Sequence, residues 1–210
     1  MKSRLPIATT TALVGILALA GCSAPVVVAP TPTESQAAPV EPDKPAENTD
    51  STDIPAGFKF ILDESGVVSV NVPDTWTDVD GASIPGPKGT TLENLAASPS
   101  LDGFVNGWDT PGMSVSSSTD PSLTIQDFVD SLLTSTGSQC EDGETGDYDD
   151  GVYVGTYLYF PSCGGTTTDF MAVIAHDADG VLVATTIQMV TDEDKTTVRD
   201  EILRTFYALY

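Results

Sequence analysis

Three strand-like segments follow one another between residues 152 and 190, and this run constrains the fold more than any other feature of the sequence. Segments 152–160, 168–175 and 181–190 are rich in Val, Ile, Tyr and Thr, the residues that favour extended structure. Only residues 176–180, which contain Asp177, Asp179 and Gly180, separate the last two segments. We interpret both aspartates as turn formers rather than metal ligands. Since short connections join antiparallel neighbours, the run predicts an antiparallel sheet.

Three further strands are predicted earlier in the chain. Segments 58–62 and 68–73 flank the turn-rich sequence Asp63-Glu64-Ser65-Gly66 and predict a hairpin. In the second of them, alternate valines predict a buried face. Segment 112–118 alternates Met and Val with small polar residues and predicts another strand.

Helices are predicted in the middle and at the end of the chain. Thr124 and Asp127 form the pattern of a capping box, and apolar residues with helical spacing follow up to Gly137. A second helix is predicted to open at Thr191, with acidic residues in its first turn and basic ones later. A short helix is predicted over 91–97. Strands with helices early, middle and last predict an α+β fold, in which helices cover the faces of an antiparallel sheet.

The first 22 residues predict export and anchoring. Lys2 and Arg4 precede the uncharged, largely apolar stretch 5–20, as in a secretory signal. The sequence Leu19-Ala20-Gly21-Cys22 resembles a bacterial lipobox. This resemblance implies a signal peptide over 1–21, cleavage before Cys22 and a diacylglyceryl group, with further acylation such as palmitate, on Cys22. An ordinary cleaved signal is the alternative, whereas a membrane-spanning anchor needs a longer apolar run.

Residues 22–53 predict a disordered tether. Prolines are scattered among Ala, Thr, Ser and acidic residues without helical or strand periodicity. Such a segment buries too little apolar surface to offset the entropy of ordering it. The globular domain is therefore predicted over 54–210.

The large negative net charge limits which classes of partner the protein can bind. The chain has 31 acidic side chains, 8 basic ones and one His, for a net charge of −23. Residues 54–210 hold 25 of these acids and 5 of the bases, or −20. A nucleic-acid partner is excluded, because no basic surface exists to neutralise phosphates. Any tight partner is predicted to be basic, neutral or bridged by divalent cations.

Two cysteines remain once Cys22 is assigned to the lipid. In an oxidising envelope Cys140 and Cys163 are expected to form a disulfide. The alternative of a reactive thiol lacks a neighbouring basic residue in the sequence. A zinc site lacks nitrogen ligands, because His176 is the only histidine. We predict no metal and no cofactor.

The sequence offers no catalytic motif. A nucleophile elbow, a phosphate-binding loop and a dinucleotide fingerprint are all missing from it, and His176 is expected in a hairpin tip. Six acidic residues in 141–150 could hold Ca²⁺ but lack EF-hand spacing, so a solvated loop is expected there. Trp76 and Trp108 are expected to close the edge of a core, with a pocket as the alternative.

Several segments together resemble a known family. These segments are Val72-Pro73-Asp74-Thr75-Trp76, 95–104, Trp108-Asp109-Thr110-Pro111-Gly112, Cys163-Gly164-Gly165-Thr166 and 202–206. Their order and spacing are similar to those of actinobacterial LpqN/LpqT-type lipoproteins, in the wider PsbP-like group related in fold to Mog-type Ran-binding proteins. The resemblance implies an α/β/α sandwich, an envelope location and no established catalytic residues.

From these patterns we expect a lipoprotein on the outer face of the cell membrane. Its predicted role is non-enzymatic binding or scaffolding toward an envelope protein, a glycolipid or a wall polymer. The alternatives are an envelope hydrolase that uses carboxylates and a Ca²⁺-stabilised interaction module.

Overall fold

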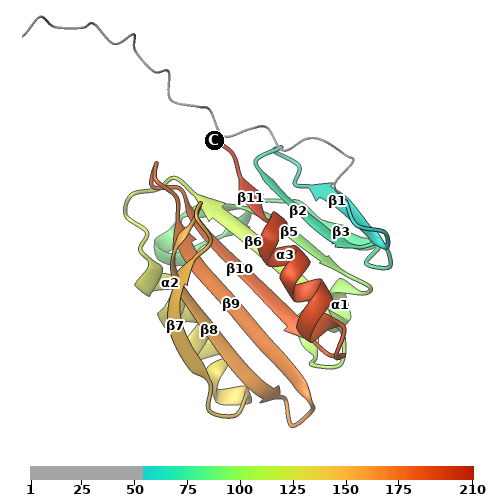
Figure 1. Ribbon diagram of the computed structural model, residues 1–210. Helices are drawn as coiled ribbons and strands as arrows, with labels where there is room; N and C mark the ends of the chain where they lie inside the picture. The colour runs from blue at the N-terminus through green and yellow to red at the C-terminus, as the bar shows by residue number, and fades with distance from the viewer. Residues whose placement is uncertain (1–53) are drawn as a thin grey trace, which may run out of the picture. The chain divides into compact units, whose positions relative to one another are not determined.

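An antiparallel sheet of eight strands organises residues 54–210, which are the residues that the computed structural model describes. The predicted signal peptide 1–21, the lipid site Cys22 and the tether 22–53 lie outside them. The strand order is β3-β5-β6-β10-β9-β8-β7, with β4 beside β5 (Figure 1). The strands are β3 (Asp78–Asp80), β4 (Ile84–Pro85), β5 (Thr91–Ser98), β6 (Gly112–Ser118), β7 (Glu144–Asp149), β8 (Val154–Cys163), β9 (Thr168–His176) and β10 (Leu182–Met189).

The predicted run of three strands is confirmed as β8, β9 and β10. They pair antiparallel in chain order, with Val173 opposite both Tyr157 and Thr185. The predicted strand over 112–118 is confirmed as β6, which lies beside β10. The centre of the sheet therefore follows from local sequence pattern.

A second, three-stranded sheet has the order β1-β2-β11. Strands β1 (Phe58–Leu62) and β2 (Val68–Pro73) form the predicted hairpin. Asp63 stabilises the turn, because its side chain accepts hydrogen bonds from the Val68 amide at 2.9 Å and from the Ser65 hydroxyl. Strand β11 (Tyr207–Ala208), near the end of the chain, returns to pair with β2.

The described helices are α1 (Leu101–Asn106), α2 (Ile125–Ser135) and α3 (Arg199–Thr205). The predicted capping box of α2 is confirmed: Thr124 accepts from the Asp127 amide at 3.3 Å, and Asp127 accepts from the Thr124 amide at 2.8 Å. The predicted helix after Thr191 begins with a wide π-helical turn, Asp194–Val198, that continues into α3.

Two local predictions are wrong. Residues 91–97 form strand β5 and not a helix, since pairing with β6 on one side and β3 on the other outweighs the helix propensity of Leu, Glu and Ala. Within the acidic segment 141–150, which was expected to be a loop, residues 144–149 form the edge strand β7. The acidic composition pointed to a loop, but an edge strand also has exposed positions that acidic residues can occupy.

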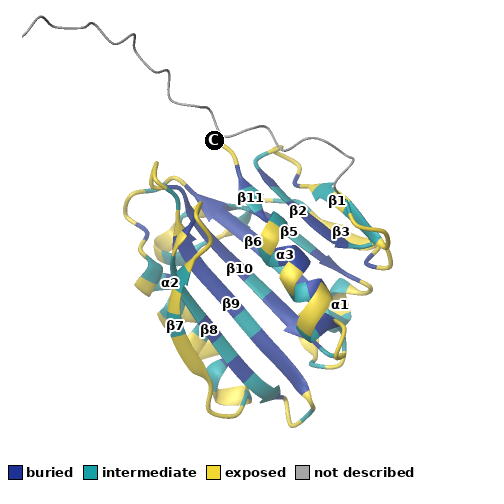
Figure 2. Ribbon diagram, viewed as in Figure 1, coloured by how far each residue is buried: buried dark blue, intermediate teal, exposed yellow. Residues whose placement is uncertain are grey.

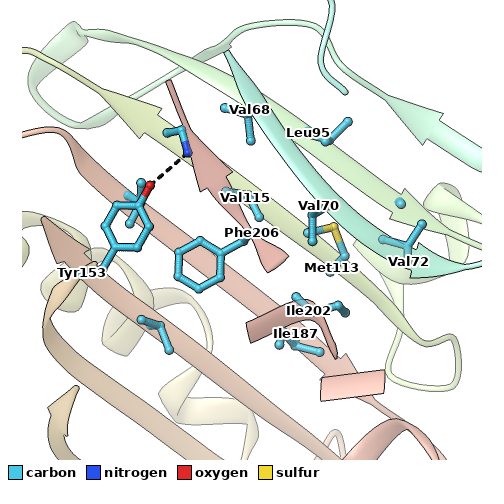
Figure 3. Packing of buried hydrophobic residues seen from close by; sticks show 14 of the residues in the cluster. Val68, Val70, Val72, Leu95, Met113, Val115, Tyr153, Ile187, Ile202 and Phe206 are labelled. Atoms are coloured by element: carbon cyan, nitrogen blue, oxygen red, sulfur yellow. Dashed lines mark hydrogen bonds between the residues drawn. The ribbon is translucent and has the colours of Figure 1, made fainter. Parts of the chain in front are cut away.

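Side chains on the two faces of the large sheet enter different clusters, as the period of two requires. On one face, residues of β5, β6 and β10 pack with β2 and α3 around the fully buried Ile202, Met113 and Val70 (Figure 3). Tyr153 and Phe206 stack in this cluster, with ring centroids 5.2 Å apart. On the other face Phe128 of α2 packs on β8, β9 and β10. The fold is α+β, with buried strands between these elements (Figure 2).

Candidate functional site

A hollow of about 200 Å³ lies where α2 meets strands β5, β6 and β10. Its volume is close to that of about seven liquid water molecules. Its lining consists of Ile84, Pro85, Pro87, Leu92, Ser114, Ser116, Phe128, Ser131, Leu132, Ala184 and Thr186. None of these side chains is ionisable, although the domain around them carries 25 carboxylates. The hollow is therefore a neutral site in a strongly acidic domain.

Polar side chains of the sheet stand among the apolar lining. Ser114 and Ser116 both donate to Asn94 Oδ1, at 2.8 and 2.9 Å. Thr186 is the cross-strand partner of Ser114. Farther along the sheet this same face carries the apolar residues Leu158 and Ile174. The change from apolar to hydroxyl-bearing residues thus falls at the hollow, where Phe128 supplies an aromatic ring.

Segment 84–89 borders the hollow and is held to α2 by one lysine. Lys88 Nζ donates to the Ser122 carbonyl and to Asp127 Oδ2, each at 2.8 Å. Lys88 has a φ of 57°, in the left-handed region that non-glycine residues rarely adopt. These contacts hold the backbone of the segment in that conformation beside the hollow.

The carboxylate that holds Lys88 is strongly acidic. The hydrogen bonds from Lys88, and then those from Thr124, lower the pKa of Asp127 from 3.8 to about 2. Asp127 therefore both caps α2 and fixes segment 84–89. Both contacts are stronger with the ionised form, and Asp127 carries its charge throughout the physiological range.

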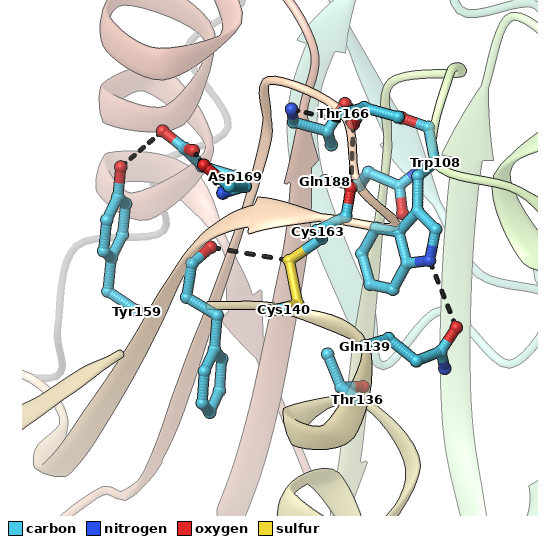
Figure 4. The surroundings of a disulfide bond; sticks show 12 residues. Trp108, Thr136, Gln139, Cys140, Tyr159, Cys163, Thr166, Asp169 and Gln188 are labelled. Carbon is cyan, nitrogen blue, oxygen red and sulfur yellow. Dashed lines mark hydrogen bonds between the residues drawn. A yellow bond between two sulfur atoms is a disulfide. The ribbon is translucent and has the colours of Figure 1, made fainter. Parts of the chain in front are cut away.

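The predicted cysteine partners hold the other end of α2. Cys140, just after the turn that follows α2, and Cys163, at the end of β8, lie with their Sγ atoms 2.02 Å apart, as in a disulfide (Figure 4). Trp108 lies against this junction and donates from Nε1 to Gln139 Oε1 at 3.2 Å. A Cβ on Gly164 would fall 2.2 Å from Trp108 Cδ1, so only glycine fits beneath the indole.

The two tryptophans have different surroundings. Trp76 is 2% exposed in the cluster beneath α3, as expected for a core residue. Trp108 is half-buried against Phe170, with an interplanar angle of 82°. Neither residue lines the hollow.

The remaining residues considered for catalysis or metal binding do not form a common site. His176 is exposed at the end of β9, and its ring contacts the Asp177 carbonyl at 3.2 Å. Asp177 accepts the amides of Asp179 and Val181, each at 2.9 Å, which is the role of a turn former. Within residues 54–210, no three His, Cys, Asp or Glu side chains are placed to hold a metal ion together.

Buried carboxylates serve structural contacts. Asp194 accepts from the Thr191 hydroxyl and amide, each at 2.8 Å, and Glu201 accepts from Asn71 Nδ2 at 2.8 Å. Burial opposes the ionisation of Asp169, but hydrogen bonds from Tyr159 and Lys195 together hold its pKa below the ordinary value. Glu201 thus joins α3 to β2, and Asp169 joins β9 to Lys195 in the turn before α3, whereas Asp194 stabilises the start of that turn.

Sequence reasoning missed the polar residues of the hollow. Ser114 and Ser116 were noted only as polar positions of a strand, and Lys88 and Asn94 were not singled out. The usable signal was two serines with a period of two, which place small hydroxyls on one buried face of a strand.

Comparison with solved structures shows similarity to a PsbP protein. The solution structure of cyanobacterial PsbP (CyanoP) from Synechocystis is 14% identical to this chain, with a TM-score of 0.48, and the match covers 74% of this chain and 94% of that one. No family model and no curated protein matches the chain. Membership of the LpqN/LpqT family stays a prediction.

No helix within residues 54–210 is long and apolar enough to span a membrane.

Proposed function

We propose that the chain is a lipoprotein on the outer face of the cell membrane, held there by acyl groups on Cys22, and that its domain binds an envelope partner without turnover. We further propose that it is an LpqN/LpqT-type lipoprotein with a PsbP-like α/β/α sandwich. The hollow beneath α2 is the proposed binding site. It takes one neutral, ring-sized group, such as a sugar of a glycolipid or wall polymer.

The observation that carries this proposal is the neutrality of the hollow. The domain has a net charge of −20, yet the lining combines the hydroxyls of Ser114, Ser116 and Thr186 with apolar side chains. Sites of this mixed kind orient a ligand with a few polar groups and bury its apolar surface. A sugar ring presents both hydroxyls and apolar C–H groups, and an anionic group would meet the surrounding negative potential.

Acyl groups supply the attachment that the charge of the domain opposes. A surface of −20 is repelled by anionic lipid headgroups. Two or more acyl chains anchor a protein stably, whereas a single chain does not. The tether is proposed to keep the domain within reach of membrane and wall components.

Binding at the hollow is tested with octyl glucoside, a neutral sugar with a short alkyl chain, at concentrations below its micelle threshold. We expect saturable binding of octyl glucoside to the full chain, and none of octyl sulfate. Ser131→Leu places a larger side chain in the lining, on an exposed position of α2, and should abolish binding. Ser135→Leu, one turn along the same helix and outside the lining, is the matched control and should bind normally. Equal binding by both variants would refute the site.

Anchoring is tested separately by metabolic labelling with a fatty-acid probe. Cys22→Ala should abolish incorporation into the chain, whereas Cys140→Ala should leave it intact. Label retained in Cys22→Ala would refute the lipid site. Release of the alkyl chain or of sugar from octyl glucoside by the full chain would refute binding without turnover.

A further inference from the structure

Strand β7 is one edge of the large sheet. It pairs with β8 through residues 144–149, and within the described part of the chain no strand pairs with its other side (Figure 1). A free edge presents a row of backbone donors and acceptors that an added strand can use. The hollow beneath α2 lies among other strands of the sheet, so this edge is a separate surface.

The edge is strongly acidic, and its carboxylates form no ion pairs within the described residues. Six exposed carboxylates occupy 141–150, and the sequence from 89 to 194 contains no Lys or Arg. Within residues 54–210, the ion pairs involve Asp127, Asp169, Asp200 and Glu201, none of which belongs to the edge. A strand that lies against β7 would therefore meet carboxylates that form no ion pair with the described residues.

Aromatic rings stand beside these carboxylates on one face. Tyr157 lies opposite Gly146, and Tyr148 lies opposite Gly155, which places both tyrosines on the same face of the β7–β8 pair. A Cβ on Gly146 would fall 2.6 Å from Tyr157 Cε1, so this ring reaches over β7 toward the edge. The Tyr148 hydroxyl donates to Asp150 Oδ2 at 2.8 Å, which fixes the second ring.

We propose that β7 accepts an extended, basic segment of a partner protein as an added strand. Backbone hydrogen bonds to the free edge supply register, as in other cases of strand addition. Alternate Lys or Arg side chains on one face reach Glu144 and the ring of Tyr157, where cation–π attraction adds to the ion pair. Side chains on the opposite face reach Asp147 and Asp149.

The acidic charge of the edge also disfavours a second copy of this chain as the added strand. Two β7 edges side by side would bring like charges into contact, and charged edges are a known protection against such pairing. Charge repulsion therefore disfavours pairing between two copies of this chain, whereas a basic partner is attracted.

The probe is a ten-residue peptide that alternates lysine and threonine, titrated into the isotopically labelled full chain at low salt. We expect saturable binding, with the largest amide shifts in residues 144–149. A peptide with glutamate in place of lysine should not bind. Methylating alternate backbone nitrogens of the lysine peptide should weaken its binding at least tenfold. The methylated nitrogens cannot donate hydrogen bonds to the backbone carbonyls of β7.

Charge reversal on the protein supplies the matched comparison. Glu144→Lys with Asp147→Lys should weaken the lysine peptide about tenfold, since two ion pairs become repulsive contacts. Glu64→Lys with Asp74→Lys makes the same change in net charge at exposed positions outside the edge and should cost less than about twofold. No binding, equal loss in both pairs, or full binding of the methylated peptide would each overturn the proposal. The methylated peptide tests it without any change to the protein.

Discussion

Breaking the Cys140–Cys163 bond should lower stability by about 3 kcal/mol. The two residues are 23 positions apart, and in the chain-entropy model a loop of this length restricts the unfolded chain by about that free energy. For a domain of this size, that corresponds to a drop in melting temperature of roughly 6–12 °C. The loss should appear first around Trp108, which packs on the loop beside Cys163.

The assay is thermal unfolding of Cys22→Ala, with and without a reductant, followed by circular dichroism and by tryptophan fluorescence. Removing Cys22 leaves two cysteines, so thiol counting is unambiguous. Cys140→Ala with Cys163→Ala in the same background should melt like the reduced protein and ignore the reductant. Two reactive thiols in the untreated protein, or equal melting temperatures with and without reductant, would show that the disulfide does not supply this stability.

Three further predictions rest on single contacts. The hydroxyl of Thr185 is buried without a hydrogen-bond partner within the described residues, so Thr185→Val should raise the free energy of unfolding by about 1 kcal/mol. Thr168→Val is the control: its hydroxyl donates to a backbone carbonyl at 2.6 Å, and denaturant titration should show a loss of about 1 kcal/mol. Gly155→Ala would place a Cβ 2.2 Å from a carbonyl oxygen of β9 and should cost at least 1–3 kcal/mol in the same titration. Because the folded pKa of Asp127 is below its unfolded value, its contribution to the free energy of unfolding is present above about pH 4 and is lost as the pH falls toward about 2. Titration of this carboxyl group by NMR should give a midpoint near 2 rather than 3.8.

Local sequence signals predicted the elements whose neighbours are close in the chain. The hairpin of β1 and β2 and the capping box at Thr124 depend on residues within a few positions of each other, and both are confirmed. Segment 91–97 failed because its local preference is helical, whereas its structure is decided by pairing with β6. Such a partner is invisible to local propensity.

The candidate site was less predictable than the fold. At its base Ser116 of β6 donates a hydrogen bond to Asn94 of β5. At its border Lys88 contacts Asp127, which is 39 residues away in the sequence. No spacing rule connects residues so far apart. The cysteine pair was easier to anticipate, because the chain has three cysteines and the lipobox resemblance reserves Cys22 for the lipid.

The hollow beneath α2 is proposed to bind a neutral, ring-sized group. This binding is tested by contacts between octyl glucoside and assigned methyl groups of the full chain, measured as intermolecular nuclear Overhauser effects. We expect contacts from the sugar protons to Leu92, Leu132 and Ala184, which line the hollow. Contacts confined to exposed methyl groups such as those of Val105 and Leu209, or no contacts under saturating conditions, would contradict it.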